Sequence, residues 1–264
     1  MKNIFKKTIL ILFILPLASN VFAYDAINAQ WNVNIFWHYG FCSGNTFDHE
    51  KDSATMYVVY SDGSIKSGSP KHYLMSYGIA SDYLPFKALL FNNDNSAIRF
   101  GFRAKADSNS ISQKITVGDG DVYKKYEWKK DYMSYYSLSG GVVVYLAPYV
   151  VNLAEHDNDS MRSAPYMFTL FATVGTLLQG KITPYPIVQS EVLKTQKSYS
   201  LNGVIYETGM GFEISAATNR HIGCNVAYNV VQYNIDSSIK KDFDYKTSNL
   251  FNTINIEIYA GITF

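Results

Sequence analysis

The chain has 264 residues, of which 47% are hydrophobic, 16% are aromatic and 17% are charged, and its formal net charge is +1. This composition excludes an intrinsically disordered chain, and the near-neutral charge gives no reason to expect nucleic-acid binding as the main activity. Two cysteines are too few for a disulfide scaffold or a cysteine-based zinc module. The 22 tyrosines favour β-strands, because aromatic and β-branched residues fit a pleated surface.

The amino terminus has the layout of a secretory signal peptide. It combines three lysines, a short apolar run and a small-x-Ala cleavage motif: Lys2, Lys6, Lys7, Thr8–Leu15 and Val21-Phe22-Ala23. The apolar run is too short to cross a bilayer as a helix. We therefore expect export and cleavage of residues 1–23, which leaves 24–264 as a single domain. Removing three lysines leaves 23 − 3 = 20 basic residues against 22 acidic ones.

Strict alternation of apolar and other residues runs to the end of the chain. Ile254, Ile256, Ile258 and Ile262 share one face, and Glu257 lies on the other. The same period of two predicts eight strands. They lie near residues 31–40, 72–91, 96–105, 134–151, 164–179, 201–216, 221–234 and 250–264. The second of these strands is expected to change register near Ser81-Asp82.

The predicted connections alternate in length. Those at 92–95 and 217–220 are short, whereas 152–164 is of intermediate length and interrupts the rule. Four are long and polar: 41–71, 106–133, 180–202 and 234–249. Within the first of them, Tyr57–Tyr60 and Ile65–Lys66 predict a small hairpin.

This rhythm predicts an all-β fold, a closed antiparallel up-and-down transmembrane β-barrel with long extracellular loops. In lipid every backbone N–H and C=O must be paired internally, so strands can cross a membrane only as a closed cylinder. The apolar faces would then meet hydrocarbon, and the charged faces would line the lumen. A soluble barrel would have the opposite polarity. The low charge, the abundant aromatic residues and the ionisable residues opposite uniform apolar faces favour the membrane.

The signal peptide, the eight-strand rhythm and the Ile-x-Ile-x-Ile-x-Ala-x-Ile-x-Phe ending resemble small bacterial outer-membrane β-barrel proteins of the general OmpA/OmpX-like type. The resemblance implies a location in the bacterial outer membrane, in contact with its lipids and lipopolysaccharide-like glycolipid. It also implies that the barrel-assembly machinery reads a carboxy-terminal signal. The matching positions are Ile256, Ile258, Ala260, Ile262 and Phe264.

Six charged residues are the candidate functional residues, because their strand phase points them into the lumen. They are Arg99, Arg103, Lys105, Glu207, Glu213 and Glu257. An eight-stranded barrel has room for packed side chains rather than a wide channel, and buried charges must pair or stay hydrated. The network is either a structural plug of salt bridges or a gated ion path.

Other motifs give weaker indications. His49 lies among Asp48, Glu50 and Asp52, but no histidine has metal-ligand spacing, so we expect no metal or cofactor. Resemblance to an outer-membrane lipid A deacylase would require a serine where Gly223 follows His221, and no nucleophile–base set is visible, so no catalytic residue is expected.

Two further features concern the ends of the predicted barrel. Cys42 and Cys224 fall at opposite ends, too far apart for a disulfide. The basic and aromatic segment 124–130 belongs to a long predicted loop, where it either contacts anionic lipopolysaccharide or host glycans or forms a solvated hairpin.

The sequence thus favours a membrane-embedded structural or surface-interaction protein, whose loops would serve adhesion, envelope integrity or contact with a host ligand. These roles are what the resemblance implies. Two alternatives are a narrow pore or small-solute channel, and a secreted or periplasmic soluble β-barrel that binds a ligand.

Overall fold

The computed structural model describes residues 24–25, 30–43, 57–59, 65–67, 69–93, 95–119, 123–152, 162–183, 198–217, 219–236 and 248–264. The predicted signal peptide at 1–23 and the cluster around His49 lie outside these residues. Within the same ranges, no helix is long and apolar enough to span a bilayer.

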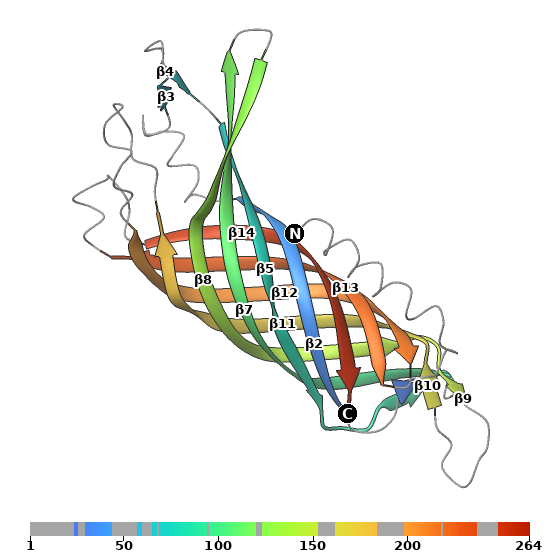
Figure 1. Cartoon of the computed structure of the whole chain (residues 1–264). Helices are drawn as coiled ribbons and strands as arrows, with labels where there is room; N and C mark the ends of the chain where they lie inside the picture. The colour runs from blue at the N-terminus through green and yellow to red at the C-terminus, as the bar shows by residue number, and fades with distance from the viewer. Residues whose placement is uncertain are drawn as a thin grey trace.

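Eight long strands form a closed antiparallel barrel, in which each strand pairs with the next and the last pairs with the first (Figure 1). They are β2 (Gln30–Ser43), β5 (Ser69–Leu84), β7 (Ser96–Asp119), β8 (Tyr123–Ala147), β11 (Tyr166–Ile182), β12 (Tyr199–Ala217), β13 (Arg220–Ile235) and β14 (Ser248–Thr263). The predicted fold and strand number are confirmed. The polar and apolar alternation of each strand sets its register, since a slip of one residue would turn every side chain to the other face.

The largest correction concerns residues 106–133, where a long loop was expected. β7 and β8 instead continue as one antiparallel ladder, from Ala97 opposite Ala147 to Asp119 opposite Tyr123. This hairpin stands out beyond the rest of the barrel, at the end opposite the carboxyl terminus (Figure 1). The segment 124–130 is therefore part of a strand rather than a loop.

The second predicted strand, 72–91, is also corrected. Pairing with β2 passes through Ser81 and Asp82 without a change of register, and the ladder ends at Leu84. After residues 85–88 the chain forms β6 (Leu89–Phe91), which pairs with the start of β7. The break thus falls later than expected.

Short strands complete the described structure. β3 (Tyr57–Val59) pairs with β4 (Ile65–Ser67), as predicted for the first long connection. β1 (Tyr24–Asp25), β9 (Val151–Asn152) and β10 (Arg162–Ala164) form a small separate sheet. The intermediate connection 152–164 therefore carries β10, and its first residue ends β9.

The barrel has an apolar exterior, and the charged residues of its strands lie in the interior. On β14, Ile254, Ile256, Ile258 and Ile262 are 58%, 54%, 53% and 43% exposed, whereas Glu257 is 3% exposed. All eight strands show the same arrangement, with large apolar side chains outside and Asn, Ser, Thr, His and charged residues inside. A soluble barrel that binds a ligand would need the reverse, because its exterior faces water.

Aromatic side chains gather at both ends of the exterior. Near the hairpin end, Tyr39, Phe41 and Tyr73 are in mutual contact, with ring centroids 5.5–5.9 Å apart. At the other end Trp31 makes an edge contact with Tyr83. Ten residues of β2 separate Trp31 from Phe41, about 33 Å along a strand. At a strand tilt of about 40° this corresponds to roughly 25 Å along the barrel axis, the height of the apolar band of a membrane barrel.

Candidate functional site

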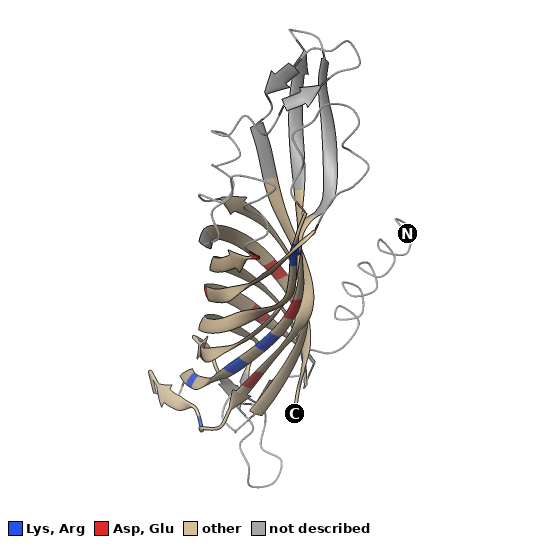
Figure 2. Ribbon diagram, turned by 90° about the vertical axis from the view of Figure 1, so that its left-hand side faces the viewer, with Lys and Arg blue, Asp and Glu red and all other residues tan. Residues whose placement is uncertain are grey.

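The six predicted charged residues all lie inside the barrel and are buried: Arg99, Arg103, Lys105, Glu207, Glu213 and Glu257. Figure 2 shows acidic and basic residues distributed along the barrel strands rather than gathered at one end. Their contacts are centred on Lys105, Arg103, Glu213 and Arg99, and the sequence did not reveal some of their partners.

Lys105 is the centre of the first group. Its Nζ donates to Glu207 Oε1 and to Glu257 Oε2, both at 2.8 Å, and so joins β7 to β12 and β14 across the lumen. Asn225 donates to the other oxygen of Glu257 at 2.7 Å. The ammonium group also lies 4.4 Å from the centroid of the Phe36 ring, a cation–π contact.

Arg103 belongs to a second group, closer to the carboxy-terminal end of the barrel. Its Nε and Nη2 bind the two carboxylate oxygens of Asp82 in a bidentate pair, each at 2.7 Å. Tyr145 donates to the same carboxylate at 2.5 Å. The guanidinium lies 4.3 Å from the centroid of the Phe171 ring. A planar fork that meets both carboxylate oxygens is the strongest geometry for a buried ion pair.

Glu213 lies in a third group, which contains no lysine or arginine. Tyr259 donates to its Oε2 at 3.0 Å, and His221 Nε2 is 3.9 Å from the same oxygen. His221 also hydrogen-bonds to Asn34 Oδ1 at 2.5 Å. This histidine is buried in the lumen and does not face lipid.

Arg99 donates to Gln30 Oε1 at 2.6 Å near the same end of the barrel. Asp107, two residues after Lys105 on β7, accepts a hydrogen bond from Asn109 at 2.6 Å and another from Ser137. Asp82 and Asp107 were not among the predicted site residues. Both keep the inward phase of their strands, and that phase is the signal that could have identified them.

Inward glycines make room for this network. A Cβ placed on Gly211 would collide with Asn225 Oδ1, and one on Gly261 would collide with Asn34 Oδ1 and His221 Nε2. In the narrow lumen, large polar side chains therefore occupy the space next to glycines, which have no side chain. Gly140 faces outward and differs, because the nearest heavy atom to its added Cβ lies 3.8 Å away.

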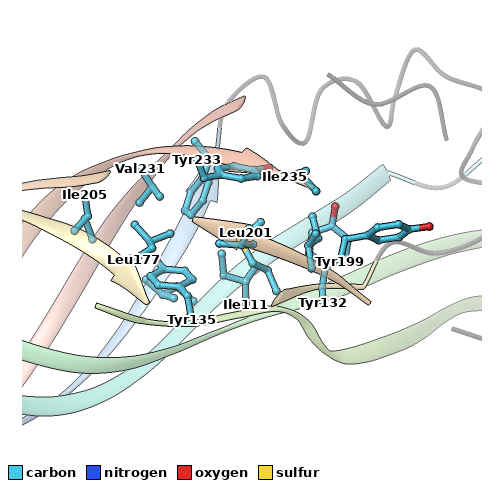
Figure 3. Packing of buried hydrophobic residues seen from close by; sticks show 14 residues of the cluster. Ile111, Tyr132, Tyr135, Leu177, Tyr199, Leu201, Ile205, Val231, Tyr233 and Ile235 are labelled. Carbon is cyan, nitrogen blue, oxygen red and sulfur yellow. The ribbon is translucent and has the colours of Figure 1, made fainter. Parts of the chain in front are cut away.

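The lumen is apolar toward the hairpin end. Fourteen buried residues from the inner faces of the strands pack together there, and Figure 3 shows many of them converging. Four are tyrosines: Tyr132, Tyr135, Tyr199 and Tyr233. We name this group the apolar plug. Its position was not predicted, since an inner wall that changes from polar to apolar gives no separate signal in the alternation.

The carboxy-terminal residues form the closing seam of the barrel. Ile256, Ile258, Ala260 and Ile262 lie opposite residues of β2, and Phe264 exchanges two backbone hydrogen bonds with Trp31, at 2.9 and 3.1 Å. The side chain of Phe264 is exposed beside the apolar band. Recognition of these residues during assembly stays a prediction.

Two further expectations concern metals and disulfides. In the described part of the chain, no group of three His, Cys, Asp or Glu side chains is arranged to hold a metal ion. Cys42 and Cys224 are both free thiols, as predicted. Cys42 packs against the apolar plug, and Cys224 is exposed on the outer surface.

The fold and its polarity define a class: a closed eight-stranded antiparallel β-barrel built to cross a membrane. The predicted resemblance to small outer-membrane barrels is confirmed at the level of fold. Comparison with protein-family models and with curated proteins gives no match.

Solved structures with a similar fold include three bacterial surface or outer-membrane proteins. Neisserial surface protein A is 10% identical over 89% of this chain and 98% of that one, with a TM-score of 0.37. OprG from Pseudomonas aeruginosa is 10% identical over 93% and 99%, with a TM-score of 0.42. Ail of Yersinia pestis, solved with a heparin analogue, is 13% identical over 90% and 100%, with a TM-score of 0.32.

Proposed function

We propose that the protein is a non-conducting scaffold of the bacterial outer membrane that displays its long hairpin and loops at the cell surface. The observation that carries this proposal is the closed lumen. Lys105 bridges two glutamates from the opposite wall, Arg103 is paired with Asp82, and the apolar plug fills the end near the hairpin. An eight-stranded barrel has little room beyond its own side chains, so this packing supports a barrel without an open path for solutes.

The membrane location rests on the apolar band, its height and its aromatic borders. Small outer-membrane barrels place long loops outside the cell and short turns in the periplasm. The β7–β8 hairpin is thus the outermost element. Its two strands extend beyond the barrel and do not enclose any further lumen. Adhesion, envelope integrity or contact with a host ligand are the roles that such display serves. An enzymatic role is not part of the proposal.

We expect purified protein in planar bilayers to give no steady unitary currents at moderate voltage. Incorporation is verified by recovering folded barrel, which migrates differently from heated protein on gels. A general-diffusion porin reconstituted at the same protein-to-lipid ratio serves as the positive control. Stable unitary currents from the wild-type protein, lost on Glu257→Gln, would overturn the scaffold in favour of a narrow ion path through the luminal charges.

Surface display is tested separately by cysteine labelling of intact cells. The background carries Cys42→Ala and Cys224→Ala, and a new cysteine replaces Asp119 at the hairpin or Lys87 near the opposite end. A membrane-impermeant maleimide should label D119C in intact cells, and should label K87C after the outer membrane is permeabilised. Labelling in the reverse order would show that the barrel has the opposite orientation.

A further inference from the structure

The charges inside the barrel do not balance evenly along its length. Among the buried charged residues that the structure describes, Arg99 and Arg103 match Asp82 and Glu213 in number. Around Lys105, in contrast, there are three carboxylates, those of Asp107, Glu207 and Glu257. With neutral histidines, this middle section has a formal charge of 1 − 3 = −2. A buried uncompensated charge is costly, so these carboxylates need either protons or a bound cation.

The same section contains buried polar atoms without a partner in the protein. They belong to His38, Ser76, Tyr135, Asn229, Thr253 and Asn255, each at least nine-tenths buried. Most are oxygen atoms of hydroxyl or amide groups, and His38 lacks a hydrogen bond but has Glu257 as an ion-pair partner. Buried polar groups are normally hydrogen-bonded, so a cluster of such exceptions calls for a bound ligand or water.

Strand pairing shows that these residues form one belt around the inner wall. Along one side Tyr135 lies opposite Asn109, Asn109 opposite Ser76, and Ser76 opposite His38. His38 in turn lies opposite Glu257, with His38 Nδ1 and Glu257 Oε2 3.7 Å apart.

Along the other side Glu207 lies opposite Asn229, and Asn229 opposite Thr253. These two series of paired residues meet on β14, whose inner face carries Thr253, Asn255 and Glu257 in succession. The belt of unpartnered groups therefore extends from the excess of negative charge around Lys105 to Tyr135 of the apolar plug.

We infer that this belt encloses a binding site for a small monovalent cation with part of its hydration shell. Hydroxyl, amide and carboxylate oxygens are the ligands of hard cations. Transition metals are disfavoured, because no three His, Cys, Asp or Glu side chains among the described residues converge. A monovalent ion needs fewer direct carboxylate ligands than Ca²⁺, and the neutral oxygens of the belt supply the remainder. Since the apolar plug closes one end, the ion is enclosed during folding and exchanges slowly.

The experiment measures the urea midpoint of unfolding for the full chain, refolded in detergent micelles separately in KCl, NaCl or N-methylglucamine chloride at equal ionic strength. Urea is uncharged and does not compete for the site. A cation that binds the folded barrel raises the midpoint. We expect a clearly higher midpoint in KCl or NaCl than in N-methylglucamine chloride. Equal midpoints in the three salts would overturn the inference.

Two variants of equal chemistry provide the specificity test. Asp107→Asn removes one negative charge from the belt but keeps an oxygen for Asn109 and Ser137, and should greatly reduce the cation dependence. Glu213→Gln removes one negative charge from the section in which Arg99 and Arg103 match Asp82 and Glu213 in number. Tyr259 donates to Glu213 there, and this variant should leave the cation dependence in place. The opposite result, or an equal loss in both, would contradict the site. If a variant does not fold, crystals of the wild-type protein grown in RbCl decide: an anomalous peak within the belt supports the site, and its absence overturns it.

Discussion

Replacing Lys105 by methionine should destabilise the barrel by about 3–5 kcal/mol, the cost of leaving buried charges without their partner. The substitution keeps the length and apolar stem of the side chain but removes the ammonium group that bridges Glu207 and Glu257. Two carboxylates would then lie in the lumen without a cation between them. The measurement is urea unfolding of refolded protein in detergent micelles, followed by tryptophan fluorescence.

The control for this variant is Lys87→Met, since Lys87 is exposed between β5 and β6, and its midpoint should match that of the wild-type protein within error. A triple variant that adds Glu207→Gln and Glu257→Gln should recover most of the loss, because the uncompensated charges disappear with the cation. Wild-type stability of the single methionine variant would show that Lys105 does not hold the barrel walls together.

Ile256→Arg should destabilise the barrel in a lipid bilayer by about 2–4 kcal/mol, the cost of an arginine on the lipid face near the midplane. Ile256 is in the middle of the exposed row on β14, between Ile254 and Ile258. Ile262→Arg is the matched control on the same strand and face. It lies near the end of the band, where the cost falls to roughly 0–1 kcal/mol.

The measurement is the free energy of unfolding in lipid vesicles for both variants. Equal costs at the two depths, or none at either, would be incompatible with a membrane around this surface.

Alternation predicted the barrel best where a strand stays within the membrane. In β12, β13 and β14 most outward positions are apolar, so the faces and the boundaries were recovered closely. The failure at 106–133 has a physical cause. Beyond Lys105 the outward positions of β7 are Ala106, Ser108 and Ser110, and a strand that leaves hydrocarbon no longer needs an apolar face. Beyond this point backbone hydrogen bonds alone extend the pairing of β7 with β8, and the amino-acid pattern does not predict that extension.

The sequence predicted which residues point into the lumen, but it did not predict which of them contact one another. Arg103 and Glu257 were identified because they oppose apolar residues, but Asp82 was obscured by an apparent change of register, and Asp107 by a strand ended too early. Pairing across the lumen depends on the stagger of the strands, which periodicity does not specify. The apolar plug was missed because Ile205, Val231 and Phe251 continue the inner faces that carry Glu207, Asn229 and Thr253.

The seam between β14 and β2 joins opposite ends of the domain: Thr263 Oγ1 donates to Asn32 Oδ1 across 231 positions of sequence. A contact of such range has a large loop-closure entropy and forms late. Until the final strand arrives, both β2 and β13 present an open edge with unpaired amides and carbonyls, which is a template for aggregation. A chain whose barrel is not yet closed is therefore more prone to aggregate than the finished barrel.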